Sequence, residues 1–204
     1  VPELLDSASP EGIEVWQLTT GEMRASHIYM EAHVFTPDSK RLVLQRGSDA
    51  HGFERRDNPD FQYLLCDLEN DGELIPLSDE INASAMALAP AGDWFYYFVD
   101  DTRLPGPTGD ITLKRVSLDG LTRETLKVID APLPGMSRRL GRLYPISTIS
   151  SDGKRLVASS FLGTGLEKNG DFCLLRCDLE TGATEMIHCN RRYPNPHTQY
   201  CRST

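Results

Sequence analysis

A repeated hairpin pattern constrains the fold of this chain more than any other feature. An apolar strand end runs into a short turn rich in Ser, Asp and Gly, and the chain leaves through a basic and then apolar strand. Asp caps such a turn through its side chain, and Gly accepts the positive φ that a tight turn requires. Copies of this first module begin at Phe35, Leu88, Ile149 and, incompletely, Tyr200.

A second module recurs in step with the first, in apolar stretches that contain Cys66, Val116 and Cys177. The first module repeats after 53, 61 and 51 residues, and the second after 50 and 61. Two hairpins per repeat give four antiparallel strands, which is the size of a propeller blade. The sequence therefore predicts an all-β fold, a β-propeller of four-stranded antiparallel blades. The predicted repeats span about residues 27–78, 81–130 and 142–188, and a fourth begins near residue 197.

The chain length bounds the number of blades. At this spacing 204 residues accommodate about three and a half blades, too few for a comfortable closed ring. An open arc would leave a blade face bare at each end. We therefore expect residues 1–204 to form a single partial propeller domain, about half of a longer protein, whose remaining blades are its partner.

Composition excludes some kinds of partner. The formal net charge is −9, and basic clusters do not exceed two or three residues, which argues against a nucleic-acid partner. No apolar run approaches the length of a membrane span, so we expect no membrane partner either. The five cysteines are an odd number without a disulfide-framework spacing. They predict buried thiols in a reducing compartment, the cytoplasm, with the periplasm as the alternative.

Three local patterns give more specific expectations. Residues 13–18 alternate like a strand, which suggests the outer strand of a preceding blade. The run Trp94–Phe98 is aromatic throughout, so both faces of that strand must be covered, as in a blade between two neighbours. Cys173 and Cys177 could be a metal-binding pair, but their apolar strand favours a packing role.

The candidate functional residues lie where the chain crosses from one blade to the next. His197 precedes the fourth innermost strand, and Arg191 and Arg192 stand before it. Arginine binds a carboxylate through two parallel hydrogen bonds, and a neutral imidazole can take a proton. These residue types suit an acidic ligand. His27 occupies the corresponding crossing into the first repeat, although a histidine there can also simply bond to backbone.

The chain resembles the oligogalacturonate lyases along nearly its whole length, as the N-terminal part of that family. The resemblance rests on these stretches: Trp16-Gln17-Leu18-Thr19, Ser26-His27-Ile28-Tyr29, Phe35-Thr36-Pro37-Asp38, Leu175-Arg176-Cys177-Asp178-Leu179-Glu180-Thr181-Gly182 and Pro196-His197-Thr198-Gln199-Tyr200. It implies a seven-bladed propeller that cleaves short oligogalacturonides by metal-assisted β-elimination. The implied cofactor is a divalent metal, typically manganese, whose ligands would lie beyond Thr204.

The resemblance also implies roles for individual residues. His197 matches the position of the Brønsted base, and His27 and Gln199 are implied to bind substrate. Family members often carry an arginine where this sequence has Cys173, which leaves the substrate-clamping role to Arg176, Arg191 or Arg192. No residue of this chain is expected to be a metal ligand.

Two other functions fit the repeats. A prolyl-oligopeptidase-like peptidase uses such a propeller beside a separate catalytic domain, but this chain contains no Gly-x-Ser-x-Gly motif. A TolB-like interaction propeller needs no histidine held at a crossing. The sequence that follows in a longer protein would separate these possibilities, since a later His/Gln cluster would favour the lyase.

Overall fold

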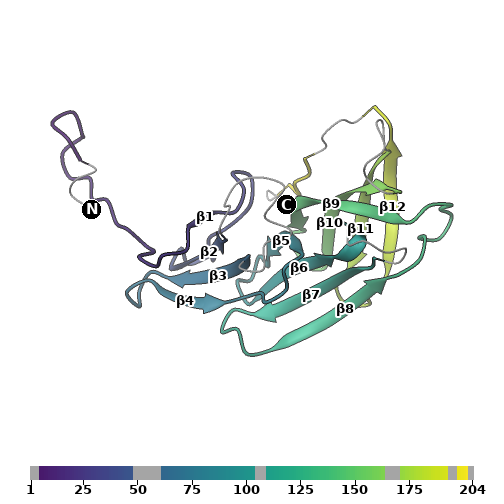
Figure 1. Cartoon of the computed structure of the whole chain (residues 1–204), viewed down its shortest axis with the longest axis horizontal. Helices are drawn as coiled ribbons and strands as arrows, with labels where there is room; N and C mark the ends of the chain where they lie inside the picture. Colours follow the sequence, from purple (N-terminus) through teal and green to yellow (C-terminus); the bar gives the residue numbers. More distant parts are fainter. Residues whose placement is uncertain (1–4, 48–60, 104–108, 164–170, 193–196, 202–204) are drawn as a thin grey trace.

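The computed structural model describes residues 5–47, 61–103, 109–163, 171–192 and 197–201. The described part is all-β, with twelve strands and one short 3-10 helix, η3 (Asp101–Arg103). The strands form a partial propeller whose blades fan out side by side (Figure 1). The predicted fold class is therefore confirmed. No helix among the described residues has the length and apolar character to cross a membrane.

The strands fall into three groups of four, which we call blades 1, 2 and 3. Blade 1 contains β1 (Ala25–His27), β2 (Arg41–Arg46), β3 (Gln62–Asp67) and β4 (Glu73–Pro76). Blade 2 contains β5 (Ala83–Leu88), β6 (Trp94–Asp100), β7 (Ile111–Ser117) and β8 (Arg123–Ile129). Blade 3 contains β9 (Leu140–Ile149), β10 (Arg155–Leu162), β11 (Phe172–Asp178) and β12 (Thr184–Asn190). Consecutive strands within each blade pair antiparallel.

The innermost strands of blades 2 and 3 touch. β5 and β9 run parallel and pair at Met86 and Ile146, which joins the two blades into one eight-stranded sheet. Blade 1 remains a separate four-stranded sheet. Each blade starts with its inner strand and ends with its outer one, and the inner strands of blades 2 and 3 lie next to each other with the same direction. This arrangement brings the residues that lead into each blade toward a common axis.

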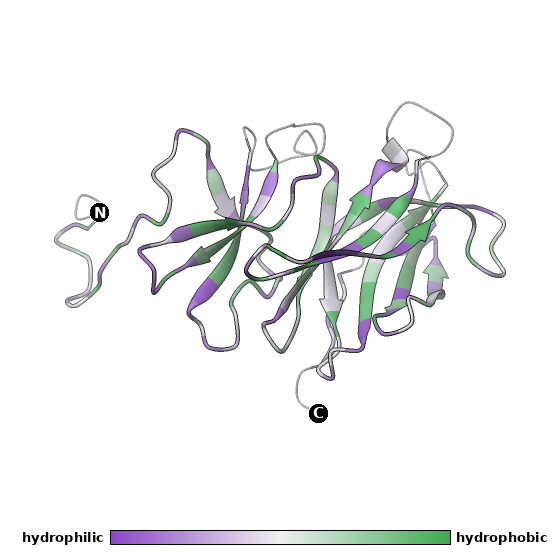
Figure 2. Ribbon diagram, turned by 90° about the horizontal axis from the view of Figure 1, so that it is seen from below, coloured by the Kyte–Doolittle hydropathy of each residue, from purple (hydrophilic) through white to green (hydrophobic). Residues whose placement is uncertain are grey.

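Buried apolar side chains form the cores between the blades, and the strands of the blades carry many hydrophobic residues (Figure 2). On β6, Phe95 and Tyr97 belong to the core shared with blade 1, whereas Tyr96 and Phe98 belong to the core shared with blade 3. The predicted coverage of both faces of this strand is thus confirmed. Burial of an aromatic side chain contributes roughly 1.5–3 kcal/mol or more, so these two layers account for much of the stability of the middle blade.

The repeated turns have the predicted chemistry. In blade 1 the carboxylate of Asp38 accepts a hydrogen bond from the backbone N–H of Lys40 at 3.1 Å, and in blade 3 Asp152 accepts from Lys154 at 3.0 Å. The residue after each Asp has positive φ, 59° at Ser39 and 72° at Gly153. The two turns are therefore equivalent in geometry although only one contains glycine.

The N-terminal segment departs from the prediction. Residues 13–18 belong to no strand of the described sheets, and Trp16 is 75% exposed. A strand is stabilised by hydrogen bonds to a neighbouring strand, and this segment extends away from the blades (Figure 1). The alternating pattern alone was not sufficient to form a strand here.

The cysteines divide into two groups. Cys66, Cys173 and Cys177 are buried, which confirms the prediction for the strand positions, and burial raises the pKa of the Cys177 thiol to about 12. Cys189 and Cys201 are exposed, so the expectation that all five thiols are buried is wrong. Both lie where the chain leaves the core, on the last described strand or after it.

Candidate active site

The first innermost strand is interrupted, and the interruption supplies part of the candidate site. β1 pairs with β2 as far as His27 and Leu44, and the chain rejoins β2 at Val34, whose carbonyl accepts from the backbone N–H of Val43 at 2.8 Å. Residues 28–33 protrude between these two points. A turn in which the N–H of Ala32 donates to the carbonyl of Tyr29 at 2.9 Å closes the protrusion.

His197 lies against this protrusion and against blade 3. Its Nδ1 contacts the Glu31 carboxylate, and its Nε2 is 3.4 Å from the Tyr144 hydroxyl on β9. The rings of Tyr144 and Tyr29 flank the imidazole, with centroids 5.3 and 5.6 Å away. The His197 side chain is 27% exposed and that of Glu31 is 36% exposed. The imidazole is therefore held on several sides but remains accessible.

Two hydrogen bonds fix the residues that follow His197. The Gln199 amide donates to the backbone carbonyl of Glu31 at 3.1 Å, and the backbone N–H of Tyr200 donates to the Thr148 hydroxyl at 3.2 Å. The first bond ties the fourth inner segment to blade 1 and the second ties it to blade 3. Gln199 thus supports the position of His197 in this structure. Pro194 and Pro196, expected to stiffen the approach, lie outside the described residues.

This geometry defines which nitrogen can act as a base. An ionised carboxylate can only accept hydrogen bonds, so in the neutral imidazole Nδ1 carries the proton that points at Glu31. Nε2 then has a free lone pair, toward which the Tyr144 hydroxyl can donate. When Nε2 takes a proton, the Glu31 carboxylate stabilises the positive charge that develops. The arrangement can perform general-base chemistry.

Two cavities lie along the inner strands near this group. A small one, of about 20 Å³, is lined by Glu31, Met86, Ser147, Thr198 and Gln199, among others, and has room for about one water molecule. A larger one, of about 240 Å³, lies toward the repeated turns. Its lining residues are His33, Phe35, Pro37, Leu88, Ala89, Pro90, Ile149 and Ser151.

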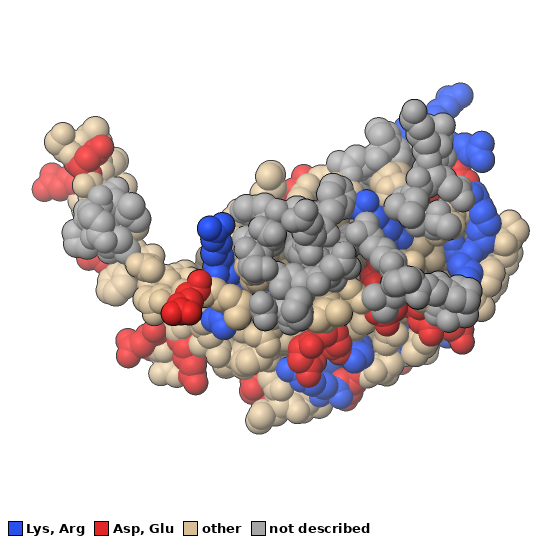
Figure 3. All heavy atoms as spheres, in the orientation of Figure 1, with Lys and Arg blue, Asp and Glu red and all other residues tan. Residues whose placement is uncertain are grey.

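The predicted substrate-binding arginines have acidic partners. Arg176 on β11 pairs with Glu185 on β12, and Arg191 donates from Nε to Asp171 at 2.8 Å. Arg138 binds the other oxygen of Asp171. The hydrogen bond from Arg191 holds the pKa of Asp171 below its usual range, and the bond from Arg138 lowers it further. Several Lys and Arg side chains surround this side of blade 3 (Figure 3).

The remaining predicted substrate-binding residues, Arg192 and His27, are exposed. Arg192 is exposed beyond β12, and its backbone N–H donates to the Asn190 side chain at 2.9 Å. His27 is the last residue of β1 and is exposed, directly before the protrusion that carries Glu31. In the sequence, Arg191 and Arg192 stand before His197. The structure instead places a carboxylate on its Nδ1.

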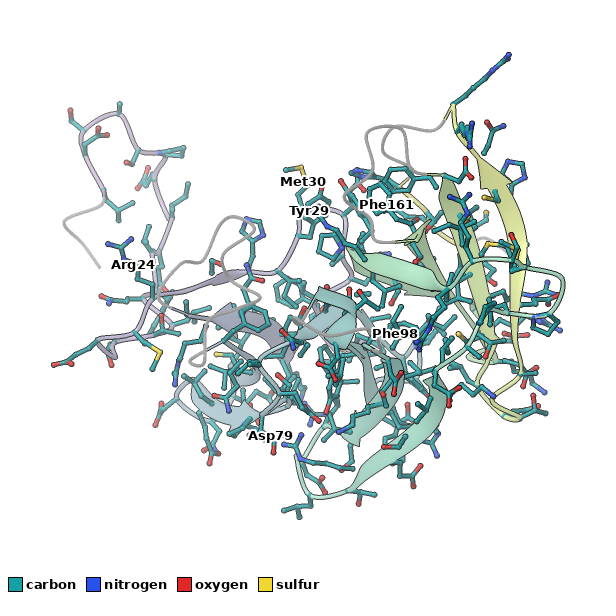
Figure 4. All side chains as sticks on the ribbon, turned by 45° about the vertical axis from the view of Figure 1, so that its right-hand side comes forward. Arg24, Tyr29, Met30, Asp79, Phe98 and Phe161 are labelled. Carbon is teal, nitrogen blue, oxygen red and sulfur yellow. The ribbon has the colours of Figure 1, made fainter. Side chains whose placement is uncertain are left out.

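Sequence reasoning missed the residues that hold His197. Glu31 and His197 are separated by 166 positions, so no local pattern joins them. Tyr29 was part of a motif noted above, but its contact with His197 depends on the interrupted strand. Tyr144 lies on β9 without a distinguishing motif. Figure 4 shows Tyr29 and Phe161 near the same end of the molecule, although they come from blades 1 and 3.

The described residues bring together too few ligand side chains for a metal ion. They contain no group of three or more His, Cys, Asp or Glu side chains that could hold one. His197 has Glu31 as its acidic neighbour, which supplies two potential ligands at most. The donor set of the described residues therefore does not fit the divalent metal that the resemblance implies.

Comparison with known proteins places the fold among solved propellers. No family model and no curated protein matches the sequence. An oligogalacturonate lyase from Vibrio parahaemolyticus matches 85% of the chain with a TM-score of 0.61 and 20% identity. An oligogalacturonate lyase in complex with manganese matches 85% with a TM-score of 0.60 and 22% identity. A putative TolB from Agrobacterium tumefaciens matches 77% of the chain, and 48% of its own length is covered, with a TM-score of 0.49 and 17% identity.

The first two structures define a distant structural relationship. The chain spans 43% of the length of each, less than half of either protein. At 20–22% identity this likeness shows a shared fold, the β-propeller, seen here in part.

Proposed function

We propose that this chain is part of an oligogalacturonide lyase, which cleaves short acidic oligosaccharides of the pectic type by β-elimination. The observation that carries the proposal is the imidazole of His197, bound through Nδ1 to Glu31 and approached at Nε2 by Tyr144. The two lyase structures of the same fold support it. A histidine whose Nδ1 is fixed by a carboxylate and whose Nε2 points toward a partly exposed region suits proton abstraction.

The reaction needs a base in reach of one particular carbon. The proton on the carbon next to the uronate carboxylate is weakly acidic, and Nε2 of His197 removes it. The electron pair of that C–H bond forms a double bond to the neighbouring carbon, and the glycosidic oxygen leaves with the electron pair of the broken C–O bond and takes up a proton from water. Glu31 orients the ring and stabilises the imidazolium, while the ring of Tyr144 limits water at one side of it.

The substrate carboxylate needs a cation, and Arg142 is the arginine we propose for it first. Arg142 and Tyr144 are both half-buried on β9, whereas Leu143 between them is fully buried in the core toward blade 2. The two side chains therefore point away from that core together. The Arg142 guanidinium carbon is 6.0 Å from the ring centre of Phe161. Arg176 and Arg191 bind the acidic side chains of Glu185 and Asp171.

The other predicted substrate-binding residues have less direct roles in the proposal. His27 and Arg192 are exposed on the approaches to this region and are proposed to contact more distant sugar units. Gln199 acts through the backbone of Glu31 rather than on the substrate. A divalent metal, manganese by analogy with one of the two lyase structures, would have to be bound by residues outside those described.

Substitution of His197 tests the proposal. In the longest protein that contains this chain, His197→Ala should lower turnover on digalacturonate by about 100-fold or more, the usual scale of a general base, while the circular dichroism spectrum stays unchanged. Turnover is followed by the ultraviolet absorbance of the unsaturated product. His188→Ala, which removes an exposed histidine on β12, is the matched control and should retain full activity.

Wild-type turnover in His197→Ala would remove this residue from the chemistry. If the wild-type protein itself produced no unsaturated product from any oligogalacturonide, an interaction propeller of the TolB-like kind, or the propeller of a prolyl-oligopeptidase-like peptidase, would replace the lyase as the preferred function.

Substitution of Glu31 tests how His197 is positioned. Glu31→Gln keeps an oxygen that can accept from Nδ1 but removes the negative charge, so kcat should fall by at least about tenfold, with KM little changed. The pH dependence of kcat should also change, because the charge that stabilises the imidazolium is lost. An unchanged pH profile together with an unchanged kcat would show that Glu31 serves only the packing of the protrusion.

A further inference from the structure

Cys173 and Cys189 face each other across two neighbouring strands. The register of β11 and β12 places them directly opposite, between the pairs Phe172 with Asn190 and Leu174 with His188. The ladder is regular at this point, since its irregularity falls beyond Leu174. Directly opposed residues of an antiparallel pair have Cβ atoms about 4.5–5.5 Å apart, and a disulfide needs about 3.5–4.5 Å. A small approach of the strands is enough to join the two sulfurs.

The environments of the two thiols differ. Cys173 is 1% exposed and belongs to the core between blades 2 and 3, whereas Cys189 is exposed on the outermost strand of blade 3. A dissolved reagent therefore reaches Cys189 before it reaches Cys173. Burial is the main cause that raises the pKa of the Cys173 thiol, and the neighbouring Cys189 raises it further, so little Cys173 thiolate is present to react first.

This arrangement differs from the pair suggested by sequence spacing. Cys173 and Cys177 lie on the same strand, four residues apart, so their Cα atoms are separated by about 13 Å, too far for a disulfide. Both side chains point into the same apolar core. The partner that the sheet brings to Cys173 is Cys189, which lies on the next strand.

We propose that Cys173 and Cys189 form a redox-active modification site that reacts with low-molecular-weight disulfides. The Cys189 thiolate attacks one sulfur of the reagent, forms a mixed disulfide and releases one reagent thiolate. Cys173 then loses its proton and attacks the Cys189 sulfur, which releases the second reagent thiol. The protein dithiol is oxidised to a disulfide by two electrons, and the reagent disulfide is reduced to two thiols.

The cross-link would lie beside a cluster of ion pairs in blade 3. The Cys173 thiol donates to the backbone carbonyl of Asp171 at 3.9 Å, and the Asp171 carboxylate holds Arg138 and Arg191. Cys189 is two residues before Arg191. A bond between the sulfurs would fasten the end of β12 to the start of β11, the place where these three charged side chains meet.

The test is oxidation of the native protein with glutathione disulfide. We expect loss of two of the five thiols in residues 1–204 and a Cys173–Cys189 link in peptide mapping under non-reducing conditions. The melting temperature should rise by about 5 °C, because the loop between the two residues is closed in the unfolded chain, and dithiothreitol should reverse the rise. Cys189→Ser should abolish the link and the temperature shift. Cys201→Ser, which removes the other exposed thiol, is the matched control and should behave like wild type.

A second variant keeps the test decisive. In Cys173→Ala, which avoids a buried hydroxyl, oxidation should stop at a glutathione adduct on Cys189. A lasting adduct on Cys189 in the wild-type protein, a link between Cys189 and Cys201, or equal thiol loss in Cys189→Ser would each overturn the proposal. None of these outcomes depends on lyase activity.

Discussion

Strand β6 of blade 2 and strand β11 of blade 3 differ in how their two faces are covered. In blade 2, neighbouring residues of β6 contribute to two different cores, Phe95 to the one shared with blade 1 and Phe98 to the one shared with blade 3. In blade 3, Leu175 of β11 is fully buried toward blade 2, while Leu174 is half-buried on the opposite face.

In these two blades, the position of a strand within its blade determines how it is covered. The second strands, β6 and β10, are buried along most of both faces, whereas the third strands, β7 and β11, alternate between buried and half-buried residues. The candidate site lies in neither sheet core. It forms at the ends of inner strands, where side chains from different blades meet without disturbing the packed layers.

The largest expected effect tests the two-sided burial of β6. Phe95→Ala and Phe98→Ala should each reduce the free energy of unfolding by about 3–5 kcal/mol, because each removes a fully buried aromatic ring and leaves a cavity. Urea denaturation followed by tryptophan fluorescence measures both. If one of the two cost less than about 1 kcal/mol, one face of β6 would be less covered than we describe.

The adjacent leucines of β11 provide the matched comparison in blade 3. Leu175→Ala should cost about 2–5 kcal/mol and Leu174→Ala clearly less, because only the first removes a fully buried side chain. The same pair measured in a longer protein that contains this chain would show whether another blade covers Leu174, since its cost would then approach that of Leu175.

An intermediate effect is expected at two equivalent turn glycines. Gly92 in blade 2 and Gly153 in blade 3 have φ of 71° and 72°. A Cβ at Gly153 meets no atom within 4 Å, so Gly153→Ala should cost only the backbone strain, about 1 kcal/mol. A Cβ at Gly92 would lie 2.5 Å from Cδ of Pro37 in blade 1, so Gly92→Ala should cost about 1–3 kcal/mol more. Thermal unfolding of both variants measures the difference, and equal costs would show that blade 1 yields easily at this contact.

The smallest expected effect is a pH dependence confined to blade 2. Burial raises the pKa of Glu80, but the hydrogen bond and charge of Lys114 lower it more, with help from the Tyr97 hydroxyl at 3.0 Å, so the pKa lies below its usual range. A depressed carboxyl pKa contributes stability above the unfolded-state pKa, and this contribution is lost as the pH falls through the folded-state value. The difference in unfolding free energy between wild type and Glu80→Gln should therefore shrink from pH 7 to pH 4. A difference independent of pH would show that Glu80 contributes through packing alone.

The sequence was sufficient for the parts of the fold that depend on neighbours along the chain. Repeated turns with Asp38 and Asp152 predicted the hairpins, and the aromatic run of β6 predicted a strand covered on both faces. Such features are determined within a few residues, by turn geometry and side-chain alternation. The strand predicted over residues 13–18 failed for the opposite reason, because strand formation needs a partner that local sequence does not supply.

The sequence indicated only some residues of the candidate site. The position of His197 before a repeated module made it a candidate. Glu31 of blade 1 and Tyr144 of blade 3 contact it only because the blades pack side by side. Cys173 and Cys189 are likewise joined by strand register rather than spacing. Contacts of this kind depend on how blades pack together.

The interruption of the first inner strand separates the pairing of blade 1 from the residues that surround His197. Residues 28–33 leave the ladder after His27, and pairing with β2 resumes at Val34, so the register of blade 1 on either side does not depend on what the protrusion contains. Met30 at its tip is 83% exposed. Ile28 anchors the base of this segment in the core, but changes of residue type at the exposed tip around Met30 can alter the surroundings of His197 without shifting any strand. This tip is therefore a place where specificity can diverge among related proteins while the scaffold stays the same.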